Sequence, residues 1–320
     1  MSSVKRIDPV GAVFAFGIPL VAAAVTIALT AMWQDRLPTQ IGTHWSSGPE
    51  PDGFSGVWSN TWFMVAMIIV IGGGCSTIAA FASVQLMLRR IMLVVGLTVT
   101  GLMFTVNTAM MASQLDLQDS ADARLNTGSI GLGVLIGVFV GLLGARALLD
   151  LRPRVQATAR PDANLPRAAS PQLPIEFNLG VRPVWLWLVC GLSAAGTVIT
   201  CIAVGSLWPL PLFAPVPLLM FATARYHVEA DKDGVRVRSL GAAMLSYELS
   251  EIEGARVVAV HPFRDFGGWG MRFKGQGRYG VVTEKGPAAQ ISMAGGDVLT
   301  ITTARAEELA GALNTLADQR

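Results

Sequence analysis

The sequence predicts a polytopic α-helical membrane protein of about six transmembrane helices, followed by a soluble all-β domain that one helix closes. Three observations support this fold class. Hydrophobic residues make up 52% of the 320 positions and charged residues only 14%, which is more apolar than ordinary soluble domains. Several uncharged runs are long enough to cross a bilayer. The charged residues gather towards the C-terminus, where residues 226–320 hold 11 basic and 12 acidic side chains.

Six runs with uncharged apolar cores have the length that a hydrocarbon core of about 30 Å requires. They lie near residues 10–32, 60–82, 91–113, 129–149, 184–204 and 206–224. Four prolines interrupt the sixth run, so it is predicted to be kinked or partly re-entrant. Such residues are tolerated where neighbouring helices satisfy the backbone.

The basic residues predict the orientation of the spans, because cytoplasmic loops carry an excess of lysine and arginine. They crowd the N-terminus and the connections after the second and fourth spans: Lys5, Arg6, Arg89, Arg90, Arg146, Arg152, Arg154, Arg160, Arg167 and Arg182. The loops 33–59 and 114–128 hold only Arg36 and Arg124. We therefore expect a protein of the cell membrane with both termini in the cytoplasm and these two loops outside.

Composition divides the chain into four parts. Residues 1–149 are predicted to form a four-span membrane domain, and residues 183–225 a two-span helical hairpin. The intervening segment 150–182 is rich in proline, arginine, alanine and serine, which is typical of an extended, flexible linker on the cytoplasmic side. Residues 226–320 are expected to form a cytoplasmic β-domain.

Short segments with alternating apolar and polar residues begin at Arg225 and are typical of strands. The predicted strands are 226–230, 234–240 and 243–249, with others near 255–260, 269–274, 278–283, 288–293 and 297–302. A helix is expected from about Ala304, with Thr303 as its N-cap and an apolar stripe of Leu309, Leu313 and Leu316. About seven antiparallel strands closed by one C-terminal helix resemble the pleckstrin-homology-like (PH-like) fold of bacterial membrane-tethered proteins, and this resemblance covers residues 206–320.

The loop 33–59 carries the most recognisable motif of the chain. It contains Leu-Pro-Thr-Gln-Ile-Gly-Thr-His-Trp at 37–45 and Pro-Asp-Gly-Phe at 51–54. These residues resemble a domain of unknown function found at the N-terminus of SdpI-type immunity membrane proteins, which protect against a sporulation-delay toxin. The resemblance covers about residues 10–80 and departs from the family at Gly42, usually proline, and at Ser46, usually asparagine. Nothing after residue 150 resembles the second half of the immunity proteins.

Six residues of this outer loop are the candidate ligand contacts: Pro38, His44, Trp45, Pro51, Asp52 and Gly53. His44 has acidic residues near it in sequence, but a lone histidine lacks the paired spacing of a zinc site. We therefore predict no metal and no cofactor. The simpler interpretation is a hydrogen-bonded histidine that orders the loop, with Pro51-Asp52-Gly53 as a turn.

Two further groups of residues suggest contact surfaces. Gly133, Gly137 and Gly141 fall four residues apart and give a flat helix face, against which a helix of the same chain or of a second copy can pack closely. Arg272, Lys274 and Arg278 are candidates for contact with anionic headgroups or a protein partner. A solvated strand face is the simpler interpretation of these three, because acidic residues balance them across the domain.

The predicted membrane runs contain no Asp, Glu, Lys or Arg in their apolar cores, which disfavours an ion-coupled transporter. The chain lacks the familiar catalytic motifs, so no catalytic residues are predicted, and its near-neutral net charge disfavours nucleic-acid binding.

We expect a non-catalytic sensing, immunity or regulatory protein with a ligand at the outer loop and a protein or membrane contact at the β-domain. Its expected partners are the lipid bilayer, an envelope peptide or other protein, and a second copy of the chain. The alternative is a carrier or accessory subunit for an uncharged or lipid-like substrate.

Overall fold

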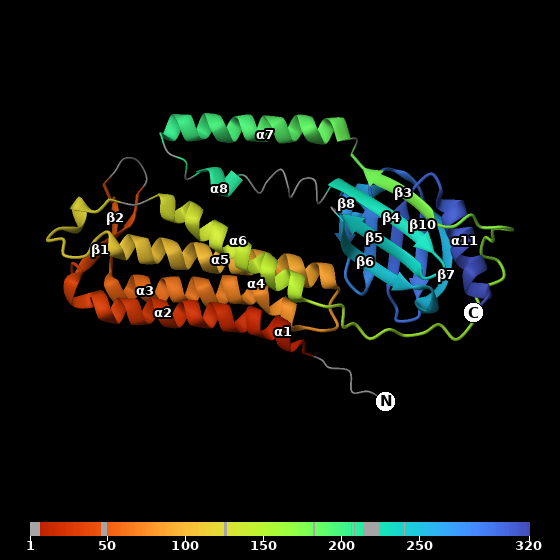
Figure 1. Ribbon diagram of the computed structural model, residues 1–320, viewed down its shortest axis with the longest axis horizontal. Coiled ribbons are helices and arrows are strands. Elements are labelled where there is room, and N and C mark those ends of the chain that lie inside the picture. Colours follow the sequence, from red (N-terminus) through yellow and green to blue (C-terminus); the bar gives the residue numbers. More distant parts are fainter. Residues whose placement is uncertain are drawn as a thin grey trace. The chain divides into compact units, whose positions relative to one another are not determined.

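The computed structural model describes residues 7–45, 50–124, 127–181, 183–205, 207, 209–213, 224–239 and 241–320, and Figure 1 shows its elements. The contacts between residues divide the chain into two compact units. The first unit comprises residues 1–152 and 194–215, and the second comprises residues 153–193 and 216–320. The first is mainly helical and the second mainly β-sheet.

Five helical stretches among the described residues are long and apolar enough to cross a membrane. They are Pro9–Arg36, Val57–Ala80, Leu86–Ala112, Gly128–Ala147 and Val184–Val204. Five of the six predicted spans are thus confirmed as apolar helices. The predicted sixth span, 206–224, falls mostly outside the described residues. Its described part includes the short helix α8 (Pro209–Phe213).

The helical elements are listed here with their bounds. They are α1 (Pro9–Ala12), α2 (Ile18–Trp33), α3 (Val57–Ala66), α4 (Gly74–Thr77), α5 (Leu86–Ala112), α6 (Gly128–Ala147) and α7 (Pro183–Val204). π-Helical turns at Val13–Gly17 and Met67–Gly73 join α1 to α2 and α3 to α4. A hairpin of strands β1 (Gln40–His44) and β2 (Gly53–Gly56) lies between the first two spans.

Glycines let α5 and α6 pack backbone against backbone. A Cβ atom added at Gly137 would lie 2.5 Å from the carbonyl oxygen of Leu97, and one added at Gly133 would lie 2.8 Å from that of Gly101. A Cβ added at Gly141 would lie 2.8 Å from Val94 Cα. The predicted glycine face therefore lies against a helix of the same chain, and helix–helix contact of this kind is typical of membrane bundles.

Arginines at the start of α5 join the ends of three other helical stretches. The buried Arg89 pairs with Asp8, which also caps α1 by accepting from Val10 N, and donates to the carbonyl oxygens of Ala79 (3.0 Å) and Leu149 (3.0 Å). Helix α5 begins five residues before the predicted span, so two residues assigned to a loop, Arg89 and Arg90, belong to the helix. A fully buried arginine needs these partners because its desolvation is costly.

The second unit contains two β-sheets. The four-stranded sheet has the order β3-β4-β5-β6 and the five-stranded sheet the order β7-β10-β11-β9-β8. Their strands are β3 (Ile175–Gly180), β4 (Arg225–Asp231), β5 (Gly234–Ser239), β6 (Ala242–Glu248), β7 (Ile252–Val260), β8 (Gly270–Phe273), β9 (Arg278–Val282), β10 (Gly286–Met293) and β11 (Val298–Thr302). All eight strands predicted after Arg225 are present.

The sheet pairing differs from the prediction in one respect. All pairs were expected to be antiparallel, but β11 runs parallel to β9, with Val298 opposite Arg278 and Ile301 opposite Val281. The reason is the path of the chain: β10 pairs with β7, and β11 then enters between β10 and β9 in the direction of β9.

Helix α11 (Ala306–Asp318) completes the core of the β-rich unit. Its buried Leu309 and Leu313 join apolar side chains of both sheets, such as Val237 and Ile291. The amphipathic pattern of the sequence thus placed this helix correctly. Thr303 was expected at the N-cap, but the helix starts two residues later and Arg305 occupies that position; the Thr303 hydroxyl instead accepts from Arg305 N.

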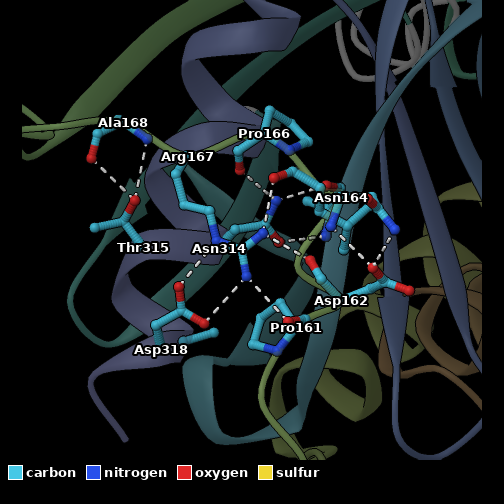
Figure 2. Close-up of polar contacts among 12 residues, drawn as sticks. Pro161, Asp162, Asn164, Pro166, Arg167, Ala168, Asn314, Thr315 and Asp318 are labelled. Carbon is cyan, nitrogen blue, oxygen red and sulfur yellow. Dashed lines mark hydrogen bonds and ion pairs between the residues drawn. The ribbon is translucent and has the colours of Figure 1, made fainter.

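Residues 150–182, predicted as a flexible linker, are integrated into the β-rich unit from residue 153 onwards. Strand β3 pairs with β4 over its whole length, and Ala157 N donates to Ser250 O at 2.8 Å. Figure 2 shows residues 161–168 along α11, where the Asn314 amide donates to Pro166 O at 2.8 Å. Proline-rich composition indicated an extended backbone, but it contained no information about these partners.

Candidate functional site

The β1–β2 hairpin places the predicted motif residues in two small groups. His44 pairs with Gly53 in the hairpin register, and its Nδ1 lies 2.6 Å from Asp52 Oδ1. Both side chains remain accessible, with 68% of His44 and 42% of Asp52 exposed. The Asp52 backbone N–H also donates to His44 O at 2.9 Å. This arrangement is that of a histidine that orders the turn and still faces solvent.

The second group surrounds Gly42. A Cβ atom added there would lie 2.8 Å from Pro51 Cβ and 3.5 Å from the ring of Trp45. Trp45 in turn packs against the buried cluster of Ile41, Met110 and Met111. Pro51 and Trp45 thus pack at the end of the hairpin where the two strands are connected, and residues 46–49 of this connection lie outside the described residues.

Gln114, which the sequence analysis did not single out, holds this hairpin onto the end of α5. Its side chain is buried. The amide oxygen accepts from Gly42 N at 2.7 Å, and the amide nitrogen donates to Gly42 O and Met110 O, both at 3.0 Å. A proline at position 42 would have no N–H for the first of these bonds.

Two ion pairs join the loops 33–59 and 114–128 reciprocally. Arg36 of the first loop binds Asp116 of the second through two hydrogen bonds of 3.0 and 2.5 Å, and Arg124 of the second lies 3.6 Å from Glu50 of the first. The hydrogen bond from Arg36 lowers the pKa of the Asp116 carboxyl. We call the described residues of these two loops the loop layer. The only two arginines of the loops are both used to join them.

A polar cleft of about 610 Å³ lies in the loop layer. Its lining comes from both loops: Asp35, Arg36, Leu37, Pro38, Thr39, Gln40, Asp116, Leu117, Gln118, Asp119 and Ser120. Pro38 is therefore the one predicted contact residue that lines this cleft, while the His44–Asp52 pair lies on the hairpin. The acidic residues of the cleft outnumber its single arginine, which is already paired, so the cleft suits a polar or cationic group.

A network of uncharged polar side chains lies at the ends of the spans that bear the loop layer. Asn60 Nδ2 donates to Asn107 Oδ1 at 2.8 Å, and the Thr30 and Thr61 hydroxyls are 2.9 Å apart. All four residues are buried. The network ties α2, α3 and α5 together without a charge, which is consistent with the cost of ions at membrane depth.

The predicted basic contact residues lie on the β8–β9 hairpin of the second unit. Lys274 N donates to Arg278 O at 2.9 Å across the turn, and both side chains line a cleft of about 360 Å³. Arg272 lies on β8, where its guanidinium packs against Gly268. The structure thus brings Lys274 and Arg278 together and leaves Arg272 at their side.

No group of three or more histidine, cysteine or acidic side chains that could hold a metal ion occurs within the part of the chain that the structure describes. His44 has Asp52 beside it, while His227 and His261 belong to the β-rich unit.

Comparison with known proteins gives one match. Residues 13–69 match the family model of a domain of unknown function, DUF1648, and this range covers most of the first span, the hairpin and about half of the second span. No curated protein and no solved structure matches the chain. At this level the comparison agrees with the resemblance of residues 10–80 to a domain of unknown function.

Proposed function

We propose that the chain is a non-catalytic sensing, immunity or regulatory protein of the cell membrane, related in its N-terminal part to SdpI-type immunity proteins. The loop layer faces the envelope side and contacts a peptide or another polar ligand. Both termini lie in the cytoplasm, where the β-rich unit contacts a protein partner or the membrane surface.

The observation that carries this proposal is the assembly of two separate loops into one layer with a cleft. Gln114 and the two reciprocal ion pairs hold the layer in place. A binding site that is ordered before the ligand arrives loses less entropy on binding. Two loops that served only as connections would need neither the buried amide contact nor a shared cleft.

For the β-rich unit we propose a PH-like domain. Two sheets share one core with the single helix α11, whose buried leucines lie between them, and this layout supports the proposal. The parallel β9–β11 pair and the added strand β3 are departures from seven antiparallel strands. We infer a recognition role for this unit, because the described residues of its core include no buried group of catalytic side chains.

The alternative of a carrier for an uncharged or lipid-like substrate is less well supported. A carrier needs a passage between its spans, whereas the backbones of α5 and α6 approach so closely that a Cβ at Gly137 would overlap Leu97. An envelope enzyme built on His44 would need several acidic or histidine neighbours, and Asp52 is the one placed beside it by the described structure.

The experiment is affinity capture of envelope components with the full-length protein in mild detergent. Four proteins are compared: the unchanged chain, His44→Ala, Asp35→Ala and His227→Ala. We expect the unchanged chain and His227→Ala to retain the same component, and His44→Ala or Asp35→Ala to lose it.

His227→Ala is the matched control, because His227 is a histidine of the β-rich unit that bonds to Asn178 at 3.2 Å. Thermal denaturation of each variant checks that the fold is retained. Identical component sets in all four proteins would contradict a ligand role for the loop layer.

A further inference from the structure

The outer face of the five-stranded sheet is strongly basic. Alternation along the strands sends Val281, Ile291 and Leu299 into the shared core, so their neighbours point to the other face. There the register sets Arg256 opposite Gln290 and Val298 opposite Arg278.

A short helix covers only part of this face. Helix α10 (Pro262–Phe266) places Phe266 over Gly280, where an added Cβ would lie 2.6 Å from the phenyl ring. Beside Phe266 an open cleft of about 360 Å³ remains. Its charged lining residues are Arg256, Arg264, Asp265, Lys274 and Arg278. Four cationic side chains thus face one carboxylate.

The one carboxylate of the cleft, Asp265, already accepts hydrogen bonds on both of its oxygens. Asp265 Oδ1 accepts from Arg264 at 2.9 Å, and its Oδ2 accepts from His261 N at 2.7 Å. The hydrogen bond from Arg264 is the largest cause that lowers the pKa of Asp265 to about 2. It therefore stays ionised at neutral pH, neutralises one arginine and leaves an excess of positive charge in the cleft.

None of the other basic residues of the cleft forms an ion pair with a described acidic residue, although the positive charge of Lys274 helps to lower the pKa of Asp265. Arg256 bonds to the neutral amide of Gln290, and neither Lys274 nor Arg278 forms an ion pair with any residue that the structure describes. On the four-stranded sheet, by contrast, Arg236 and Arg238 lie within 3.5 Å of Glu229 carboxylate oxygens. The cleft is thus a site where positive charge exceeds negative charge, unlike the four-stranded sheet, where Glu229 pairs with both arginines.

Two exposed aromatic side chains stand beside this cleft. Phe263 of α10 and Trp269, which precedes β8, are in edge-to-face contact with ring centroids 4.6 Å apart. Each is more than half exposed, 55% for Phe263 and 60% for Trp269. Tryptophan, whose ring is apolar but carries an N–H donor, is enriched at the headgroup level of membranes, and the exposed phenyl ring of Phe263 adds apolar surface beside it.

We infer that this surface, Phe263, Arg264, Trp269, Lys274, Arg278 and Arg256, docks on the anionic headgroups of a phospholipid bilayer. Charge complementarity selects the occupant: the excess cations fit headgroup phosphates, and the aromatic pair fits the headgroup layer. Each basic residue near an anionic surface strengthens binding about fivefold. Strand β3 of the same unit ends at Gly180, four residues before the apolar span Val184–Val204 begins, so a membrane surface is within reach of the unit. This inference deepens the proposed function and rests on it in assigning the β-rich unit a recognition role.

The test is hydrogen exchange on the full-length protein in nanodiscs of neutral phosphatidylcholine and in nanodiscs that also contain anionic phosphatidylglycerol. We expect backbone amides of residues 262–282 to exchange several-fold more slowly in the anionic nanodiscs. The double variant Lys274→Gln/Arg278→Gln should abolish this difference. The matched double variant Arg236→Gln/Arg238→Gln, on the other sheet, should keep it.

High salt provides a second measurement that needs no substitution, since it should remove the difference in the unchanged protein by screening. Equal exchange in the two lipids, or a difference that survives both high salt and the Lys274/Arg278 substitutions, would overturn the inference. Nanodiscs expose both membrane faces, so a failure of the proposed cytoplasmic orientation would not by itself abolish the effect.

Discussion

Two buried side-chain amides perform the same task at distant places in the chain. Gln114 pairs with both the N–H and the C=O of Gly42 in strand β1, and Asn314 pairs with both backbone groups of Ala255 in strand β7. Each amide thus forms with one strand residue the two backbone hydrogen bonds that a neighbouring strand would otherwise form. Because an unpaired buried backbone group is costly, these contacts fix the position of each strand relative to a helix end.

Replacing Gln114 by leucine should destabilise the loop layer. The substitution keeps the size of the side chain and leaves the N–H and C=O of Gly42 without partners, so we expect a loss of about 1–3 kcal/mol. Thermal denaturation in detergent measures the loss, and hydrogen exchange of residues 40–44 locates it. Gln118→Leu, at an exposed position four residues later, should be nearly neutral; equal effects of the two would refute this role for Gln114.

The Asp8–Arg89 pair gives a second prediction at the level of residues. Both side chains are buried, so Asp8→Ala leaves an uncompensated charge and should cost about 3–5 kcal/mol. The double variant Asp8→Ala/Arg89→Met removes that charge and should be destabilised by less than the sum of the two single variants. Unfolding in detergent measures all three. Strict additivity would show that the pair does not act as a unit.

At the level of elements, helix α5 is the element of the first unit that contacts α6, the β1–β2 hairpin and the ends of other helices. It packs against α6 through glycines, supports the hairpin through the residue that follows its C-terminal turn, and binds the other helix ends through Arg89. The glycine spacing and the hydropathy of α5 were visible in the sequence. Its basic first turn was interpreted as a loop, since Leu149 and Asp8, two of the three residues that bind Arg89, lie 60 and 81 positions away in the chain.

Substitution within the α5–α6 contact should separate these helices. In Gly137→Ala the new Cβ would meet Leu97 O at 2.5 Å, and such overpacking costs about 1–3 kcal/mol. Gly74→Ala is the matched control, because a Cβ at Gly74 in helix α4 meets no atom within 4 Å and alanine favours helix. The temperature of thermal denaturation in detergent should fall for Gly137→Ala only. Equal stability of both would contradict the close packing.

At the level of the whole molecule, the orientation in the membrane decides which surface meets which compartment. Arg89 is buried and Arg36 forms an ion pair with Asp116. Neither interaction changes how the basic residues are distributed among the loops when the chain inserts into the membrane. The excess of lysine and arginine therefore still predicts cytoplasmic termini. The proposed roles of the loop layer and of the basic cleft both follow this orientation.

Thiol labelling of intact cells tests the orientation. In a chain whose Cys75, Cys190 and Cys201 are replaced by alanine, single cysteines are introduced as Gln118→Cys and Lys285→Cys, both at exposed positions. An impermeant reagent should label position 118 in whole cells and position 285 only after permeabilisation. The reverse pattern would invert the proposed topology.

The sequence by itself determined the apolar helices, the strands after Arg225 and the closing helix, because burial in lipid or in one core imposes a local periodicity on the residues. Only the tertiary structure decided how distant segments combine. The Gln114–Gly42 contact joins residues 72 positions apart and the Arg36–Asp116 pair residues 80 apart, and the packing of residues 153–180 on the β-rich unit depends on partners such as Asn314. Local periodicity does not record such contacts, since they arise from side chains that meet only after the helices and strands have packed.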